Sequence, residues 1–550
     1  MKYKKILIFI FFISNTLFAQ LDDVPITSSV YDFLLRLESK GLMEHNTLSK
    51  LPLQRKEIIK ILKQVNNENK HFHFTKSEIE TANKYLFDFG YGDYSVVFPS
   101  ETDSTQIFFK GLFDGTNKAF YRYNSRSLTT EVRPLAAIDY INQTNADSSK
   151  YLIVGTLGLR WYGSFNDNFG FFLQATNGRD FSGDRSVAYG TEYMKSLKFA
   201  KLGSDIDLTQ SHVTFESGWF RAKFGRQEEL SGAGLFQRPF VSTMSPPLDE
   251  LSLSANFSSF RYSYSFANLI GYATDTYSTG FAAKLAQKYL VQHSFTALPS
   301  WGEITFWESV IIADRGLDFA YLNPLSFLKS LEHQLHDRDN SLMGMDFVIR
   351  PIRNLQIKSS FLLDDIIMEK IGTGYWSNKT AFNIAAITSL EFNTDIGVEY
   401  ARVEPYTYTH FNHQNAYTND SMMLGSFLLP NSEQYGLLMQ YWWGQKFPLK
   451  FKLTYTRHGE NIYDPSGNLI RNVGGDPRWG FRFENPDTGF QGDSPTVKFL
   501  DGNLIQTLAA EINFGYEVIN NLALFLNYRY ANCGCSDEHN FRFFVQLNEL

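Results

Sequence analysis

Large apolar and polar side chains alternate along most of the chain, in stretches of about ten residues, the length of a transmembrane β-strand. A period of two is typical of a strand with one apolar face. The clearest apolar faces comprise Phe260, Tyr262, Tyr264 and Phe266; Tyr151, Ile153, Leu157, Leu159 and Trp161; Leu449, Phe451, Leu453 and Tyr455; and Leu522, Leu524, Leu526, Tyr528 and Tyr530. Because Arg or Lys occurs on the opposite faces, the pattern predicts a mainly β protein, a transmembrane antiparallel β-barrel whose aromatic faces meet lipid.

Segment 28–89 has the period of amphipathic helices instead. Apolar residues recur at helical spacing around Phe33 and around Leu62, and Thr75 with Glu78 forms a capping box ahead of a third apolar series. The pattern predicts three short helices in a small soluble domain. We expect this domain on the periplasmic side of an outer membrane, where the termini of such barrels usually lie.

The first residues have the form of a secretory signal peptide. Lys2, Lys4 and Lys5 precede the apolar run 6–12, and small residues lead to Ala19. No later stretch reaches the roughly 18 to 20 apolar residues that a spanning helix needs. We therefore expect a signal peptide at 1–19, a periplasmic helical domain at 20–98 and an outer-membrane barrel at 99–550.

The length of the barrel region limits its strand number. About 450 residues, at roughly ten per strand plus uneven loops, predict about 16 to 18 strands. The long polar segments 177–207 and 460–494 are then extracellular loops. A secreted β-sandwich or propeller is the alternative, but no internal repeat of about 40 to 50 residues supports a propeller.

The composition agrees with this class of protein. Aromatic residues make up 16% of the chain, with 50 Phe and 30 Tyr, which suits the aromatic girdles of a membrane barrel. The formal charge of -7 argues against nucleic acid as a partner. Since only two Cys are present, disulfides cannot hold the fold together. The expected physical partner is outer-membrane lipid.

Many Arg residues share the polar parity of the predicted strands, so we expect them to face the lumen. There they pair with acids and brace the interior, or they attract an anionic solute or an acidic polysaccharide. Bracing is the more frequent purpose, because unpaired charges are costly in a low-dielectric wall. The predicted lumenal network comprises Arg160, Arg221, Arg261, Asp346, Arg350, Glu399, Arg402, Arg457 and Arg529, with Arg542 as a further member.

One aromatic and polar group is the best candidate for a sugar-binding site. It comprises Tyr406, Tyr408, His410, Asn412, His413 and Tyr417. Aromatic faces stack on sugar rings, while His, Asn and Tyr provide hydrogen-bond partners. An interfacial aromatic girdle is the equally open alternative. Trp442 and Trp443 raise the same question, since one of two consecutive Trp on a strand must face inward or toward a loop.

Other clusters argue against catalysis and metal binding. Asp364 and Asp365 are adjacent, so on a strand they point to opposite faces and cannot act together on one glycosidic bond. His71 with His73, and Cys533 with Cys535, lack four ligands at a known spacing. We predict no enzyme activity, no cofactor and no metal.

Several segments resemble the capsule assembly protein family called Wzi, and its relatives named as gliding motility protein RemB. The matching segments are Tyr321-Leu322-Asn323-Pro324 followed by Glu332 and Asp339-Asn340-Ser341; Leu363-Asp364-Asp365-Ile366; and 399–410, which reads EYARVEPYTYTH. The chain departs at Leu429, where the family has Gly before Pro-Asn, which suggests a changed turn. The resemblance covers most of the chain from about residue 114, and the helical segment also looks like the family's small periplasmic domain.

The resemblance implies an outer-membrane barrel that holds or organises surface polysaccharide, capsular or exopolysaccharide, as a lectin acting through extracellular loops. No catalysis is implied. It also suggests contact with capsule export or motility machinery. Two alternatives remain open, namely a surface adhesin or gliding motility component, and an outer-membrane diffusion channel with an Arg-lined lumen.

Overall fold

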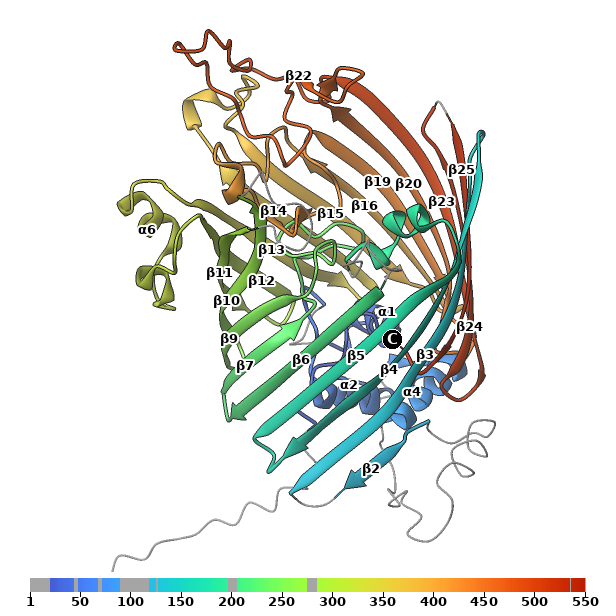
Figure 1. The fold of residues 1–550 in the computed structure, drawn as a ribbon. Helices are drawn as coiled ribbons and strands as arrows, with labels where there is room; N and C mark the ends of the chain where they lie inside the picture. The colour runs from blue at the N-terminus through green and yellow to red at the C-terminus, as the bar shows by residue number, and fades with distance from the viewer. Residues whose placement is uncertain are drawn as a thin grey trace, which may run out of the picture.

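The computed structural model describes residues 20–43, 48–67, 72–89, 118–124, 127–195, 205–274, 284–534 and 536–549. Within these ranges, 18 antiparallel strands close into one barrel (Figure 1). The upper end of the predicted range of strand numbers is thus confirmed. The expected signal peptide and the expected domain boundary at residue 98 lie outside the described residues.

The barrel closes where its last strand pairs with its first long strand. Phe543 and Tyr140 are opposite each other in this pairing. The ring runs β3 (Leu128–Thr144), β4 (Ser149–Phe165), β5 (Phe169–Gly183), β6 (Asp205–Ser217), β7 (Phe220–Gln227), β9 (Leu248–Asn256), β10 (Phe260–Ala273), β11 (Leu285–Ala297), β12 (Gly302–Ala313), β13 (Asn340–Ile352), β14 (Leu355–Asp365), β15 (Lys379–Ser389), β16 (Thr394–Val403), β19 (Ser432–Tyr441), β20 (Leu449–Glu460), β23 (Asn503–Ile519), β24 (Leu522–Asn532) and β25 (Asp537–Leu547). The short strand β2 (Tyr121–Asn124) adds to β3.

Smaller elements lie outside the ring. Two-residue or three-residue strands pair as β1 (Lys50–Leu51) with β8 (Leu230–Ser231), β17 (Thr418–Asn419) with β18 (Met422–Met423), and β21 (Ile462–Tyr463) with β22 (Leu469–Arg471). The 3-10 turns are η1 (Arg185–Gly190), η2 (Glu192–Lys195), η4 (Phe319–Leu322), η5 (Met368–Lys370) and η6 (His413–Asn415). One short helix, α6 (Leu328–Gln334), lies in the connection from β12 to β13.

The predicted alternation of apolar and polar residues determines which face of each strand is turned outward. Side chains of one parity are exposed on the outer face, among them Leu157, Phe224, Ile384, Val398 and Leu508, and the other parity is largely polar and faces the lumen. At one end, which we call the turn end, the strands are joined by short connections such as 166–168 and 353–354. The opposite loop end carries the long connections 314–339, 404–431 and 461–502.

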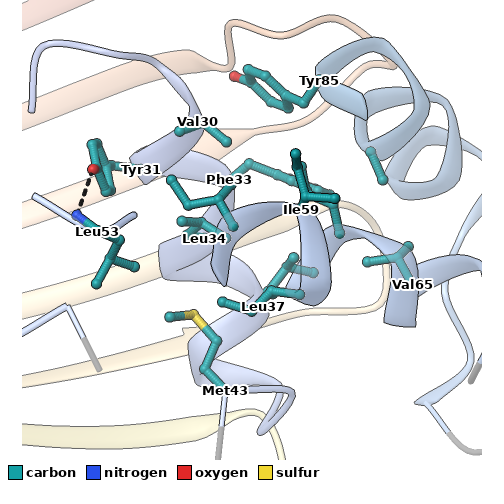
Figure 2. Packing of buried hydrophobic residues seen from close by; sticks show 14 of the residues in the cluster. Val30, Tyr31, Phe33, Leu34, Leu37, Met43, Leu53, Ile59, Val65 and Tyr85 are labelled. Atoms are coloured by element: carbon teal, nitrogen blue, oxygen red, sulfur yellow. Dashed lines mark hydrogen bonds between the residues drawn. The ribbon is translucent and has the colours of Figure 1, made fainter. Parts of the chain in front are cut away.

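Among the described residues, the predicted helical segment contains α1 (Val30–Ser39), α2 (Arg55–Asn67) and α4 (Lys76–Asp88). Their apolar faces meet in one core around Phe33, Leu34 and Leu37, and Tyr31 accepts a hydrogen bond from Leu53 N at 2.9 Å (Figure 2). The predicted capping box at Thr75 and Glu78 is present. Each helix among the described residues is too short or too polar to cross a bilayer.

This helical module, residues 20–89 as far as they are described, docks into the turn end of the barrel (Figure 1). Trp442, at the end of β19, packs in the helical core at 5.2 Å from the ring of Phe33. Lys358 on β14 forms a buried ion pair with Glu38 at 2.6 Å. Glu549, just after β25, accepts hydrogen bonds from the Ser28 hydroxyl and the Ser29 amide. The module is therefore bound to opposite sides of the barrel interior.

On the loop-end side of the module, segment 228–247 between β7 and β9 folds into the lumen, and we call it the inner loop. The carboxylate of Glu399 accepts hydrogen bonds from the backbone N–H groups of residues 235, 236 and 237 at 2.6, 3.1 and 2.7 Å. Asp346 accepts a hydrogen bond from Ser360, which in turn accepts one from Ala233 N. The two acids face the lumen as predicted, but they hold this inner loop and not Arg side chains.

The inward Arg residues brace the barrel through separate contacts. Arg221 binds Asp23 of the helical module at 2.5 Å, and Arg160 donates to Gln174. Arg350 donates to the carbonyl of Met43, and Arg542 binds Asp139. Arg529 lies 4.0 Å from Glu538, and Arg261 lines a cavity of about 230 Å³ with Lys50 and Ser263.

Two members of the predicted lumenal network face outward instead. Arg402 shares the parity of exposed Val398, and Arg457 shares that of exposed Leu449. Both lie near the loop end of their strands, where Arg402 binds Glu404 at 2.6 Å and Arg457 pairs with Glu433. This corrects the prediction, because strand parity alone decides which face a residue occupies.

Candidate functional site at the loop end

The tyrosines of the predicted sugar-binding group are buried. Tyr406, Tyr408 and Tyr417 are each 0% exposed in the connection 404–431. Tyr406 and Tyr408 have φ angles of 62° and 70°, in a region that bulky residues rarely adopt. In this position the three rings cannot contact a polymer, which corrects the expectation that they form a binding face.

Tyr408 and Tyr417 pack inside the barrel near its loop end, against the inner loop and the wall. Their rings stack at 5.8 Å, and the Tyr408 hydroxyl donates to the carbonyl of Pro239 in the inner loop at 2.8 Å. The amide of Tyr408 donates to Asp364 at 2.7 Å, and Lys379 pairs with the same carboxylate at 2.9 Å. Asp364 thus anchors this connection to the barrel wall, whereas Asp365 accepts a hydrogen bond from Ser377 outside the lumen.

Tyr406 belongs to a second aromatic cluster, formed between loops. Trp376 stacks on Phe481 at 4.2 Å with an interplanar angle of 11°, and Tyr406 meets both rings edge-on. The Tyr406 amide donates to Gly474 O at 2.9 Å, and a Cβ at Gly474 would lie 2.4 Å from that nitrogen. Connection 461–502 is therefore fixed against connection 404–431.

Four exposed aromatic side chains belong to the same two connections, and we call them the aromatic ridge: Phe411, Trp479, Phe483 and Phe490. Phe411 is 63% exposed and Phe483 is 59% exposed, although Phe483 meets the buried Phe481 ring edge-on at 5.1 Å. A Cβ at Gly480 would lie 2.1 Å from His410 O, so the loops that carry Phe411 and Trp479 touch there.

Charged and polar groups flank the aromatic ridge. Arg482 pairs with Asp493 at 2.6 Å and lies over the ring of Phe490, at 5.3 Å from its centroid. Arg478 pairs with Asp476 at 2.5 Å and remains largely exposed. These pairs hold guanidinium and carboxylate groups in fixed positions beside exposed rings, an arrangement that suits the hydroxyl groups of a sugar.

The polar members of the predicted group lie beside the aromatic ridge. His410 is half-buried against Phe411, with ring centroids 4.1 Å apart, and burial lowers its pKa to about 4. It is therefore neutral near pH 7. Asn412 donates to Asp314 at 3.3 Å, and exposed His413 lies against Tyr272 at 5.4 Å. These three residues are near the surface, unlike the three tyrosines.

Two further features bear on what the site can bind. A cavity of about 530 Å³ remains in the lumen between the helical module and the wall, lined among others by Asp139, Tyr193, Asn527 and Phe544. At the outside of the barrel, carboxylates of Glu332 and Asp337 and the ring of His333 lie within 4.8 Å of one another. Glu332 is already engaged by Lys329 and Ser341, at 3.1 and 2.6 Å.

Comparison with known proteins shows similar barrel structures and no matching sequence family. No protein-family model and no curated protein matches the chain. Among solved structures, Wzi of Escherichia coli, a carbohydrate-binding β-barrel involved in group 1 capsule assembly, aligns at a TM-score of 0.55. The fold is similar to that of Wzi. The alignment covers 96% of this chain and 100% of Wzi at 12% identity, so it shows a shared fold alone.

Two other outer-membrane barrels among the matches have lower TM-scores. OccK11 of Pseudomonas aeruginosa has a TM-score of 0.41 at 10% identity, over 76% of this chain and 95% of that protein. OprD of the same organism has a TM-score of 0.40 at 12% identity, over 76% and 94%.

Proposed function

We propose that this protein is a non-enzymatic outer-membrane barrel that binds surface polysaccharide and helps to retain or organise it. The observation that carries the proposal is the aromatic ridge at the loop end. It combines exposed rings with fixed charged groups above a lumen that is occupied by protein. The outward apolar faces of the strands support a membrane location, with the turn end and the helical module toward the periplasm.

The chemistry of the ridge suits a polymer of sugars. Exposed rings stack on the apolar faces of pyranoses, and flanking Arg, Asp and amide groups exchange hydrogen bonds with hydroxyls. Each contact is weak, but a polysaccharide repeats its epitope, and many barrels in one membrane bind one chain together. A low affinity per site is therefore sufficient to hold polysaccharide at the surface.

The test is binding of purified protein to polysaccharide from its own cells, measured by glycan array or pull-down. The double variant Trp479→Ala with Phe483→Ala should bind about fivefold or more weakly, because each stacked ring contributes about 0.5–1.5 kcal/mol. The matched control is Phe392→Ala, which removes an exposed Phe at the turn end. Unchanged binding by the double variant, or equal loss in the control, would contradict the proposal.

A diffusion channel is the second candidate, favoured by the lumenal cavity of about 530 Å³. Inside the barrel, the helical module pairs with the inner loop through β1 and β8, and the inner loop contacts the connection 404–431 at Pro239. We therefore expect little or no steady conductance from the intact protein in a planar bilayer. Steady conductance that selects for anions or sugars would favour the channel over the polysaccharide-binding barrel.

A further inference from the structure

The connection from β12 to β13, residues 314–339, leaves the loop end and folds back against the outside of the barrel. Figure 1 shows α6 outside the wall, where it contacts β12 and β13, and the turn before it reaches β10. The segment contacts outward side chains of these strands: the hydroxyl of Tyr264 donates to Tyr321 O at 3.0 Å, and that of Tyr262 donates to Pro324 O. Tyr264 is consequently buried, although it lies on the apolar face that the sequence assigns to lipid.

The outer wall carries a polar site that receives this segment. Glu308 on β12 pairs with the cross-strand His293 on β11 at 2.6 Å, and both side chains are buried on the outer face. The Glu308 carboxylate accepts the amides of Leu328 and Lys329 at 3.0 and 3.4 Å, at the beginning of α6. Such groups are costly against hydrocarbon, so the segment shields them from lipid.

Further contacts clamp both ends of the segment. Asp339 accepts a hydrogen bond from the hydroxyl of Tyr321 at 2.8 Å, and Arg315 binds Asp318 at 2.8 Å and also Asp339. Glu332 accepts a hydrogen bond from Ser341 at the start of β13. The segment is thus a fixed part of the outer surface.

The side of the segment that faces away from the barrel is apolar. Phe319 is 84% exposed, Leu325 is 81% exposed, and Leu317 and Phe327 are exposed as well. Phe327 lies parallel to the outward ring of Phe306, at 6.5 Å and 3°. The cross-strand row that begins at Phe306 continues through Met345 and Phe361, which are exposed on the outer wall. The apolar edge of the segment therefore continues the lipid-facing surface of the strands.

The other edge of the segment is polar. Residues 333, 334 and 336–338 are His, Gln, His, Asp and Arg, and all of them are exposed. One apolar and one polar edge is the arrangement of an element that lies at a membrane interface. We propose that segment 314–339 is a lipid-contacting flap, whose apolar edge lies among the acyl chains of the outer leaflet and whose polar edge lies at the level of the headgroups.

The flap enlarges the apolar perimeter of the barrel beside β10 to β13. This inference rests on a membrane location of the barrel and is independent of polysaccharide binding. A loss of sugar binding in the variants described above would leave it unaffected.

The test uses spin labels on the full-length protein in phospholipid vesicles. In a background with Cys533→Ser and Cys535→Ser, one label is placed at Phe319→Cys or Leu325→Cys. Collision rates with oxygen, which concentrates in lipid, are compared with those of a water-soluble nickel chelate. Reference labels are Leu157→Cys on the lipid face of the wall and Phe483→Cys on the aromatic ridge.

We expect the labels at 319 and 325 to collide more often with oxygen than with the chelate, as the label at 157 does. A label at His336→Cys should show the reverse order, as the label at 483 does. Two results would overturn the proposal. Preferential collision with the chelate at 319 and 325 would place them in water. Shielding from both reagents, with spin–spin broadening that disappears on dilution with unlabelled protein, would identify a second copy as the occupant. The shift of the folded barrel on unheated gels verifies that each variant is folded.

Discussion

Substitution Arg36→Ala should loosen the helical module without opening the barrel. Arg36 lies in α1 with no exposed side-chain surface, and it joins the module to the barrel. Its guanidinium donates to Glu78 of α4 at 2.7 Å, to Asp395 on β16 at 2.6 Å and to the carbonyl of Leu390 at 3.0 Å. The alanine variant leaves two buried carboxylates without this partner.

Removal of one partner from a buried ion pair costs about 3–5 kcal/mol, chiefly because the remaining charge stays buried. Glu78 retains Lys40 at 2.6 Å, and Asp395 retains hydrogen bonds from Ser389 and Trp442. We therefore expect the lower end of the range. About 3 kcal/mol corresponds to roughly a 100-fold increase in the undocked population, since 1.4 kcal/mol is a factor of ten.

Hydrogen exchange measured by mass spectrometry on the protein in detergent tests this expectation. Amides of α1 and α4 should exchange about 100-fold faster in the variant, whereas amides of β10 to β16 should keep their protection. The matched control is Lys76→Ala, which removes a highly exposed ion pair with Glu80 at 3.7 Å and should change exchange by less than about threefold. Unchanged exchange of α1 and α4, or equal acceleration in the strands, would refute the reasoning.

Three further predictions concern pH, the inner loop and the buried tyrosines. Burial of Glu78 acts to raise its pKa, but Arg36 and Lys40 outweigh burial and hold the pKa below its ordinary 4.5. The contribution of Glu78 to docking is thus present above pH 4.5 and lost as the pH falls below it. In an acid titration, the amides of α1 and α4 should therefore be the first to lose protection from hydrogen exchange, after correction for intrinsic exchange rates. Glu399→Gln should weaken the inner loop by about 1–3 kcal/mol, because the amide has one acceptor oxygen for three N–H groups; a protease cut within 228–247 should appear in this variant and not in the parent. Tyr408→Phe should leave polysaccharide binding within twofold, because its hydroxyl bonds to Pro239 in the inner loop; a tenfold loss would show that this hydroxyl supports binding.

Much of the fold could be predicted, because each strand in a barrel wall has one face toward lipid and one face toward the lumen. A row such as Leu449, Phe451 and Leu453 has to alternate with polar residues, and the alternation identifies both the strand and its outer face. The helical segment was equally predictable, since its period of 3.6 and the cap at Thr75 are local signals. Trp442 turns inward and Trp443 outward, as the alternation requires.

The site was less predictable, because loops bring together residues that are distant in sequence. Phe411 and Trp479 are neighbours only through the contact of Gly480 with the backbone at His410. Tyr408 was a plausible sugar contact by its chemistry, but its strained backbone and its bond to Pro239 turn it inward. Arg402 and Arg457 were assigned to the polar parity and hence to the lumen, but they share the parity of exposed Val398 and Leu449 and lie on the outer face. The folding of segment 314–339 against the wall had no periodic signal at all.

The contact between Glu549 and the beginning of α1 joins two distant parts of the chain. Ser28 and Ser29 lie more than 500 residues before this partner in the sequence. The set of contacts around the first helix is therefore complete only when β25 is paired with β3. A substitution of Glu549 would leave the Ser28 hydroxyl and the Ser29 amide without this acceptor, so the beginning of α1 would be held by fewer bonds.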